Sequence, residues 1–290
     1  MERHDIAIIG TGPAGVSAAV TATVRGKSVL LIGSGSGSEK LTKAAQVNNY
    51  PGFYGKSGAE IQRAFMDHLD AMGIKITEGK VGSVYDMGGY FSMSVGSDVM
   101  DADAVILAGG VVFGKPIEGE NEFLGRGVSY CATCDGMLYR GRKAAVLAYD
   151  PGESSEADFL ASIGVDVTYV KLYDGPAGVK EKMEVIEGVK PAAVEGGDSV
   201  TGVAMDDGSR IDADVAFVLR ESIAPDKLIA GLELDGAHVK VDRRMRTNID
   251  GLFAAGDITG TPYQYVKAAG EGNVAALSAV QYLDSRGGAG

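Results

Sequence analysis

The sequence predicts an α/β fold with two similar units, the second inserted in the first. A buried strand, a glycine turn, a helix and another strand open the chain at residues 5–32, and a similar order returns at 143–172. Short, continuous apolar runs are typical of buried parallel strands, and two of them joined by a helix form a βαβ unit. A closing strand and helix follow from residue 245. The predicted domains are therefore 1–116 with 245–290, and 117–244 inserted between them.

Composition and charge narrow the classes of partner. The 290 residues are 45% hydrophobic and 23% charged, with a formal net charge of −12. This acidic balance disfavours nucleic acid and anionic membranes as general partners. The first residues lack a secretory pattern, and no apolar run approaches the roughly 20 residues that span a bilayer. We expect a cytoplasmic protein with no nucleic-acid or membrane partner.

The first unit reads as a series of short strands and three helices. Ile61, Phe65, Leu69 and Met72 follow a helical spacing within the predicted helix 57–73. The tract "GSGSGSEK" has the composition of a flexible loop. The remaining predicted elements of this unit are strands at 5–10, 28–32, 80–87, 90–95 and 102–110, and helices at 13–26 and 265–283.

The inserted unit opens with both cysteines of the chain. Its predicted βαβ unit has strands at 143–149 and 166–172 and a helix at 154–164. Residues 202–219 read as a strand, an Asp-Gly turn and a returning strand.

The glycine turn after the first strand has the G-x-G-x-x-G pattern. Its first glycine permits the turn, its second lets the backbone approach a pyrophosphate, and its third lets helix and strand pack closely. The pattern predicts a Rossmann-like, dinucleotide-binding-type domain. An acidic residue at the end of the second strand normally binds the ribose, but Gly33 stands there, and Glu39 is the nearby alternative. The candidate binding residues are Gly10, Gly12, Pro13, Ala14 and Gly15.

A second candidate binding turn closes the chain. In "TNIDGLFAAGD" a strand ends at Gly256 and Asp257, which presents a carboxylate at a helix start. On its own this carboxylate reads as a helix cap.

The stretch "YCATCDG" carries the chemistry of the inserted unit. A Cys-x-x-Cys pair at a helix start can open and close as an internal disulfide, and the neighbouring acid can serve the leaving thiolate. A structural zinc site normally needs four ligands, and the three histidines are scattered. The pair could instead form a structural disulfide or stay as two buried thiols. The candidate catalytic residues are Cys131, Cys134 and Asp135.

These motifs, with "NNYPGF", "AGG" and "AAGEG" in the same order, resemble the low-molecular-weight thioredoxin reductases over nearly the whole chain. The resemblance implies two Rossmann-like domains, FAD, a homodimer, thioredoxin as substrate and a rotating middle domain. It implies that Cys134 faces the flavin, Cys131 attacks the partner disulfide and Asp135 relays the proton. It also implies FAD contacts from Asn49, Gly109, Gly256, Asp257 and Gln264.

The middle domain departs from that family where NADPH is expected. Ala148, Tyr149 and Asp150 stand in place of the glycines, and Leu172, Tyr173 and Ala177 stand where arginines should bind the 2′-phosphate. A bulky side chain and a negative charge oppose phosphate binding there. The pattern is similar to the ferredoxin-dependent flavin thioredoxin reductases, in which reduced ferredoxin supplies electrons singly to FAD.

Three different functions stay open. NAD(P)H could bind through atypical contacts, the enzyme could be a dithiol oxidase that uses oxygen, or the chain could be a flavin-binding sensor. The sequence has no histidine near the cysteine pair, as the oxidases tend to have, and it keeps Asp135. Two basic clusters are candidate ferredoxin surfaces: Lys240 with Arg243, Arg244 and Arg246, and Arg140 with Arg142 and Lys143.

Overall fold

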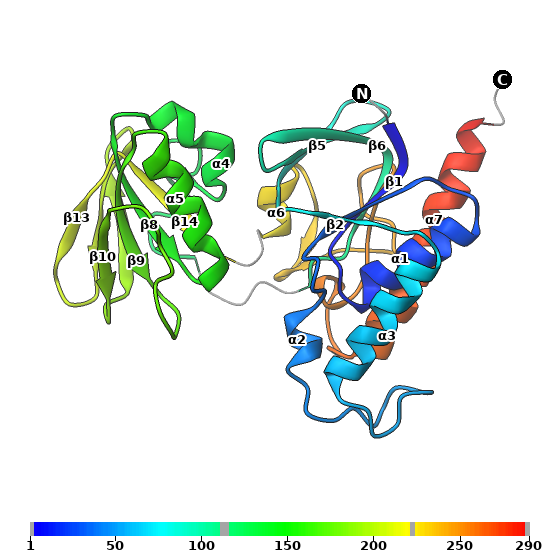
Figure 1. Cartoon of the computed structure of the whole chain (residues 1–290). Coiled ribbons are helices and arrows are strands. Elements are labelled where there is room, and N and C mark those ends of the chain that lie inside the picture. The colour runs from blue at the N-terminus through cyan, green and yellow to red at the C-terminus, as the bar shows by residue number, and fades with distance from the viewer. Residues whose placement is uncertain (1–2, 111–115, 221–223, 288–290) are drawn as a thin grey trace. The chain divides into compact units, whose positions relative to one another are not determined.

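The computed structural model describes residues 3–110, 116–220 and 224–287. The chain divides into two compact units, Met1–Val111 with Ala224–Gly290 (unit 1) and Val112–Ile223 (unit 2). Both units combine parallel strands with covering helices, so the predicted α/β class is confirmed (Figure 1). No helix among the described residues is long and apolar enough to cross a membrane.

Unit 1 is built on a seven-stranded sheet in the order β3-β2-β1-β6-β5-β4, with β17 also paired to β6. Pairs among β1, β2, β3, β6 and β17 are parallel, whereas β4, β5 and β6 are antiparallel. The strands are β1 (Arg3–Ile9), β2 (Val29–Gly33), β3 (Ile76–Glu78), β4 (Val81–Asp86), β5 (Phe91–Val95), β6 (Asp98–Leu107) and β17 (Leu252–Ala254).

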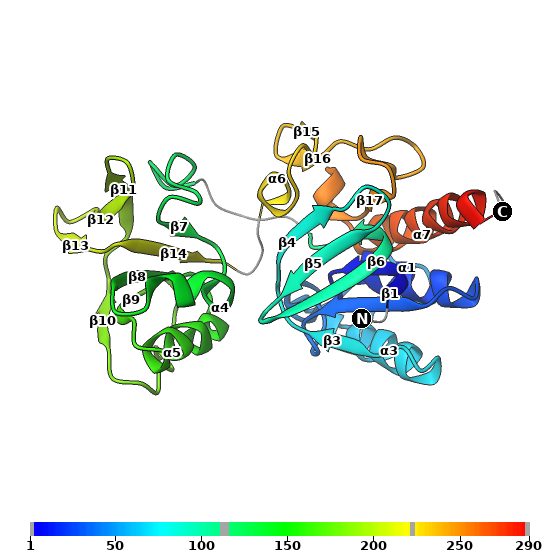
Figure 2. The ribbon, with the colours of Figure 1, turned by 90° about the horizontal axis from the view of Figure 1, so that it is seen from above.

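Two long helices of unit 1, α1 (Pro13–Val24) and α7 (Tyr265–Gly287), lie side by side against the sheet (Figures 1 and 2). A Cβ at Gly272 would lie 2.0 Å from the carbonyl oxygen of Ala14, so the two backbones touch. Their small residues pack on β1 and β6 side chains in the core. The other helices are α2 (Glu39–Thr42), α3 (Gly58–Ala71), α6 (Pro225–Leu228) and the 3-10 turn η3 (Asp257–Thr259).

The segment 224–244 corrects a predicted boundary. We expected it in the inserted domain, but it belongs to unit 1. It forms α6 and the short strands β15 (Leu234–Asp235) and β16 (His238–Val239). α6 packs against β4, β16 packs against η3, and the side chains of Leu228, Ile229 and Val239 are buried. Burial of this apolar surface holds the segment in unit 1, although its sequence has no long periodic pattern.

Unit 2 has a five-stranded sheet in the order β10-β9-β8-β14-β7 and a three-stranded antiparallel sheet, β11-β12-β13. Neighbouring residues of β8 and β14 face opposite sides, since side chains alternate along a strand. One side packs on the small sheet and the other on α4 and α5. The elements are β7 (Val128–Ser129), α4 (Ala132–Asp135), η1 (Gly136–Tyr139), β8 (Lys143–Ala148), η2 (Pro151–Glu153), α5 (Ser154–Ser162), β9 (Asp166–Lys171), β10 (Glu184–Glu187), β11 (Pro191–Gly196), β12 (Val200–Met205), β13 (Arg210–Asp212) and β14 (Val215–Leu219).

Two local predictions were wrong. The returning strand of the 202–219 hairpin is two strands, because β13 pairs with β12 while β14 pairs with β8 in the other sheet. The chain changes sheets at Asp214, whose carboxylate accepts the backbone N–H of Lys143 at 3.0 Å. The Gly/Ser tract is not entirely a loop, because α2 begins at Glu39.

Candidate active site

The glycine turn at the end of β1 cannot accommodate side chains at two positions. Gly10 has φ 120°, and a Cβ there would lie 2.3 Å from the carbonyl oxygen of Ala108. A Cβ at Gly15 would lie 1.8 Å from the carbonyl oxygen of Gly10. Gly12 differs, since the atom nearest to its Cβ position is Ser38 Cβ at 3.8 Å. The turn therefore brings helix and strand together and leaves space in front of Gly12.

The N-terminus of α1 is suited to an anion. Gly12 is its N-cap residue and makes no side-chain cap, while Pro13 at the first position has no N–H to satisfy. The free N–H groups and dipole of such a helix end favour a phosphate. Together with the space at Gly12, this geometry fits the pyrophosphate of a dinucleotide. Ala14 is buried behind the turn.

The end of β2 lacks the acidic residue for a physical reason. Gly33 has φ 155°, and a Cβ there would lie 3.0 Å from Thr11 Cγ2. Thr11 donates its hydroxyl to the Ser34 carbonyl at 2.9 Å and so closes this position. The carboxylate of Glu78, at the end of neighbouring β3, instead lies against Gly35. The side chain of Glu39 lies outside the described residues.

Asp257 follows β17, as predicted, but its partner was not predicted. Its Oδ2 accepts Lys40 Nζ at 2.7 Å, and its side chain is 14% exposed. Gly256 has φ 92° and donates its N–H to Glu271 Oε2 at 2.9 Å, while Lys267 donates to the Gly256 carbonyl at 2.8 Å. The i, i+4 spacing of Lys267 and Glu271 on α7 is the sequence signal that could have identified this support.

The remaining predicted binding residues lie in exposed turns of unit 1. Gly109 follows β6, and no heavy atom lies within 4 Å of its Cβ position. Asn49 is exposed beside Tyr50, and Gln264 is exposed beside Tyr265. Both tyrosines pack on the same apolar cluster as Leu41, which brings the two segments together, although the structure shows no contact between the two predicted side chains.

The dithiol motif connects β7 to α4. Cys131 is half-buried and disulfide-bonded, whereas the side chain of Cys134 lies outside the described residues. Asp135 Oδ2 accepts the hydroxyl of Ser129 at 2.7 Å, and Ser129 Oγ accepts the N–H of Cys131 at 3.1 Å. The buried Ser129 thus links the predicted acid to the backbone of a predicted nucleophile. Sequence reasoning missed Ser129 because one hydroxyl carries no pattern.

The corresponding edge of unit 2 is filled by its own side chains. Arg220 follows β14 and donates to both carboxylate oxygens of Glu120, at 2.6 and 2.8 Å. Its guanidinium carbon lies 4.9 Å from the ring centre of Tyr149, at the end of β8. Burial favours the neutral form of Glu120, but hydrogen bonds from Arg220 and Ile117 outweigh it, so the pKa of Glu120 lies below its usual value. A pyrophosphate has no comparable cradle here.

The expected 2′-phosphate position is also occupied. Lys171, the cation that remains at the end of β9, pairs with Glu187 at 3.1 Å and donates a hydrogen bond to the Gly175 carbonyl. Tyr173 donates its hydroxyl to the Ala177 carbonyl at 2.7 Å and therefore accepts the hydroxyl of Tyr169 at 2.9 Å. At the helix start, Asp150 accepts the N–H of Gly152 at 2.8 Å and so caps η2 itself.

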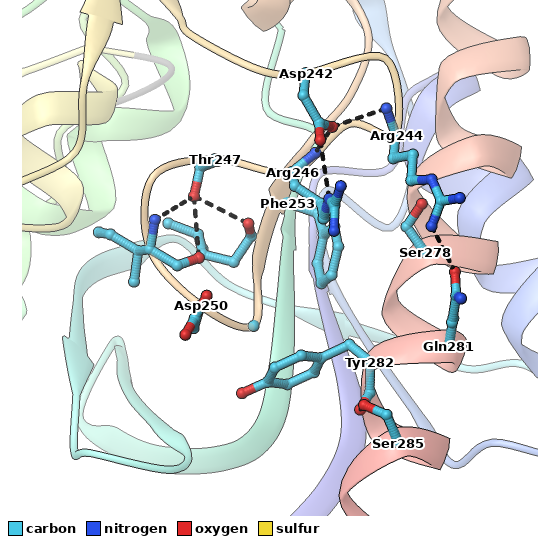
Figure 3. A pocket seen from close by; sticks show the side chains of 13 residues that line it. Asp242, Arg244, Arg246, Thr247, Asp250, Phe253, Ser278, Gln281, Tyr282 and Ser285 are labelled. Atoms are coloured by element: carbon cyan, nitrogen blue, oxygen red, sulfur yellow. Dashed lines mark hydrogen bonds and ion pairs between the residues drawn. The ribbon is translucent and has the colours of Figure 1, made fainter.

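The two predicted basic clusters lie in different units, and two of the four cations of one cluster are paired with carboxylates. Lys240 pairs with Glu233 at 2.8 Å, and Arg246 pairs with Asp242 at 2.9 Å. Arg244 reaches Gln281 on α7 across a pocket of about 450 Å³ near the start of β17 (Figure 3). This pocket is at the opposite end of β17 from Asp257. Arg140, Arg142 and Lys143 are exposed in unit 2.

Comparisons with known proteins agree with this arrangement. Residues 4–272 match the family Pyridine nucleotide-disulphide oxidoreductase. The thioredoxin reductase of Bacillus subtilis is 31% identical, over 97% of this chain and 95% of that protein. A crystal structure of a ferredoxin-flavin thioredoxin reductase from Clostridium acetobutylicum is 46% identical over 99% of both chains, with a TM-score of 0.92. The atypical thioredoxin reductase TRi from Desulfovibrio vulgaris Hildenborough is 30% identical over 98% of this chain and 99% of that one, with a TM-score of 0.70.

The match extends over both units, including the glycine turn and the dithiol motif. These findings confirm the predicted family and activity class. The chain belongs to the thioredoxin reductase family of the pyridine nucleotide-disulphide oxidoreductases, and it is a flavin-dependent disulfide reductase.

Proposed function

We propose that this enzyme passes electrons from reduced ferredoxin, through FAD and the Cys131–Cys134 disulfide, to thioredoxin. One observation carries the proposal: the nucleotide edge of unit 2 is filled by Tyr149, Arg220 and Glu120, while the dithiol motif of the same unit is intact. An enzyme that keeps its redox-active dithiol motif but has side chains in place of the NADPH site requires another electron donor.

FAD is the flavin that the dinucleotide edge of unit 1 fits. Gly10, Gly12, Pro13, Ala14 and Gly15 would hold the pyrophosphate at the start of α1. Asp257 would bind the ribityl chain or pyrophosphate after exchanging its bond with Lys40, and Glu78 would replace the missing ribose-binding acid. Gly109, Gly256, Asn49 and Gln264 complete the proposed contacts.

A bound flavin supplies the chemistry that the protein lacks, because it accepts electrons one at a time and delivers them in pairs. The chain itself supplies the dithiol and its proton. Cys131 attacks the partner disulfide, and Cys134 then displaces the reduced partner as the internal disulfide closes. Asp135, oriented by Ser129, holds the proton for the departing thiolate.

The relatives and the surface support the proposed donor and substrate. The Clostridium acetobutylicum protein is named for ferredoxin, flavin and thioredoxin, and it is 46% identical to this chain. Met137 and Leu138 are 59% and 74% exposed directly after the dithiol motif, which offers an apolar contact for a protein substrate. Arg140 and Arg142 lie next to them.

Anaerobic flavin reduction tests the donor. The purified FAD enzyme is mixed with reduced ferredoxin, NADPH or NADH, and flavin absorbance is followed. We expect rapid bleaching by ferredoxin and none by either nucleotide within the same time. Rapid bleaching by NADPH would refute the proposal and favour an atypical nucleotide site.

Cysteine variants and charge reversal test the later and earlier steps. Cys134→Ser and Cys131→Ser should keep FAD and lose thioredoxin reduction. Reversing the charges of Arg140 and Arg142, or of Arg243 and Arg244 in the other cluster, should slow reduction by ferredoxin without changing flavin content. If neither change slows reduction, electrostatic docking on these clusters is wrong.

Oxygen consumption with a small dithiol as the donor would favour a dithiol oxidase.

We further propose a cytoplasmic homodimer. A reducing compartment is where a thioredoxin dithiol is useful, and the resemblance implies two subunits. Light scattering after gel filtration distinguishes a dimer from a 29.9 kDa monomer.

A further inference from the structure

Helix α5 supports the dithiol motif through one carboxylate. Glu156, in the first turn of α5, accepts the backbone N–H of Thr133 on Oε2 at 3.0 Å. Its other oxygen, Oε1, lies 3.5 Å from the hydroxyl of Thr133. Thr133 is one of the two residues between the cysteines. In a nucleotide-binding βαβ unit this helix start faces a phosphate, but here it holds the dithiol turn.

The same hydroxyl touches sulfur. Thr133 Oγ1 lies 3.5 Å from Cys131 Sγ, so it stands between the sulfur and the Glu156 carboxylate. A hydroxyl has a single proton to donate. When Cys131 is in the disulfide, its sulfur is a weak acceptor, so the Glu156 carboxylate is the better acceptor for the Thr133 hydroxyl. When Cys131 is a thiolate, the thiolate and the carboxylate are both anions and compete for that proton.

We propose that Glu156 is a positioning residue that sets the pKa of the Cys131 thiol through Thr133. It places the Thr133 hydroxyl beside the sulfur and limits how strongly that hydroxyl stabilises the thiolate. This inference rests on the proposed function, in which Cys131 attacks a partner disulfide. A thiolate loses nucleophilicity as its pKa falls, and the best attacking thiol has a pKa near the ambient pH.

Two carboxylates are linked to Cys131 from the elements packed around it. Asp135 reaches the Cys131 backbone through Ser129, and Glu156 reaches the sulfur through Thr133. Tyr139, in η1, has a pKa raised by burial and further by Asp135, so it is neutral at ordinary pH. Two carboxylates, each acting through one hydroxyl, therefore oppose the thiolate, since like charges raise the pKa of an acid.

The test measures the pKa of Cys131 directly. In the FAD-loaded Cys134→Ser enzyme, the rate of Cys131 alkylation by iodoacetamide is followed against pH by mass spectrometry. Glu156→Gln should lower the pKa by about 0.5–1, because it removes a nearby like charge. Thr133→Val should raise the pKa by a similar amount, about 0.5–1, because it removes a donor to the thiolate. Thr133→Ser should restore the original pKa.

A double variant shows whether Glu156 acts through Thr133. In the Thr133→Val background, Glu156→Gln should lower the pKa by less than half of its effect in the parent. Shifts in the same direction for both single variants, or none for either, would overturn the proposal. If Glu156→Gln does not fold, Thr133→Val is sufficient as a test, because an unchanged pKa of Cys131 in Thr133→Val contradicts the proposal.

Alkylation requires neither ferredoxin nor thioredoxin. A failure of the proposed electron donor or substrate would therefore leave the opposite pKa shifts intact. Conversely, if the enzyme is active with ferredoxin but neither Glu156→Gln nor Thr133→Val changes the pKa of Cys131, only the inference about Glu156 is refuted.

Discussion

Both units contain a βαβ unit, but the residues after its first strand differ. After β1 in unit 1, glycines leave a backbone turn where Gly10 and Gly15 have no space for a side chain and Gly12 faces open space. After β8 in unit 2, Tyr149 and Arg220 fill the equivalent edge, and Glu120 neutralises Arg220. The difference teaches that the fold alone does not make a nucleotide site. The side chains at the carboxyl ends of the strands decide it.

The largest effect is expected at the glycine turn. Gly15→Ala would place a Cβ 1.8 Å from the carbonyl oxygen of Gly10, so helix and strand must separate. The cost should exceed the ~1–3 kcal/mol typical of overpacked cores, and the protein should be recovered without flavin. Gly12→Ala is the matched control, because its nearest neighbour is 3.8 Å away. It should fold normally yet bind flavin at least about tenfold more weakly, which a fluorescence titration measures. Unchanged affinity in Gly12→Ala would contradict a close approach there.

The filled edge of unit 2 should depend on its ion pair. Arg220→Ala leaves a carboxylate whose side chain is 2% exposed, and it should cost about 3–5 kcal/mol in urea unfolding. The double variant Glu120→Gln with Arg220→Met removes both charges and should recover at least half of that loss. If the double variant is no more stable than Arg220→Ala, the unpaired charge is not the cause.

The pH dependence of stability sharpens this point. The folded pKa of Glu120 is lowered, so its contribution is fully present above the unfolded value, about 4.3, and is lost as pH falls through the folded value. Urea unfolding between pH 7 and 3 should therefore show a larger loss in the wild type than in Glu120→Gln. Parallel curves for the two proteins would mean that other carboxylates cause the loss.

The smallest effect is expected at an exposed pair in unit 1. Arg246 and Asp242 have side chains 55% and 44% exposed, and solvent screens their attraction. Arg246→Gln should change the unfolding free energy by less than about 0.5 kcal/mol, against several for Arg220→Ala. A loss of similar size at both pairs would remove the distinction between the filled edge and an ordinary surface.

Much of the site could be predicted because its signals are local. The glycines of residues 10–15 predict a tight turn, and the Cys131–Cys134 spacing predicts a dithiol motif, each from a few neighbouring residues. Tyr149 likewise indicates, by itself, that the glycine turn is missing after β8. The partners that complete the site are distant in sequence. Arg220 meets Glu120 across 100 residues, and Lys40 meets Asp257 across 217. No periodicity encodes such pairs, since they arise only when strands align.

The predicted boundaries failed where elements are short. β3 has three residues, too few for an alternating pattern, and α2 has four, of which the first two end the Gly/Ser tract. The segment 224–244 is about as apolar as the rest of the chain, and its burial against β4 and η3 depends on tertiary contacts. Its place in unit 1 could not be read from composition.

The filled edge of unit 2 also determines how the enzyme would respond to small molecules. Inhibitors that imitate the adenosine diphosphate of NADPH require a glycine-lined slot, and Tyr149 with Arg220 leaves none. Such compounds should bind only at the proposed FAD site of unit 1, where they compete with FAD. The enzyme should flow past a 2′,5′-ADP affinity resin that retains NADPH-dependent relatives.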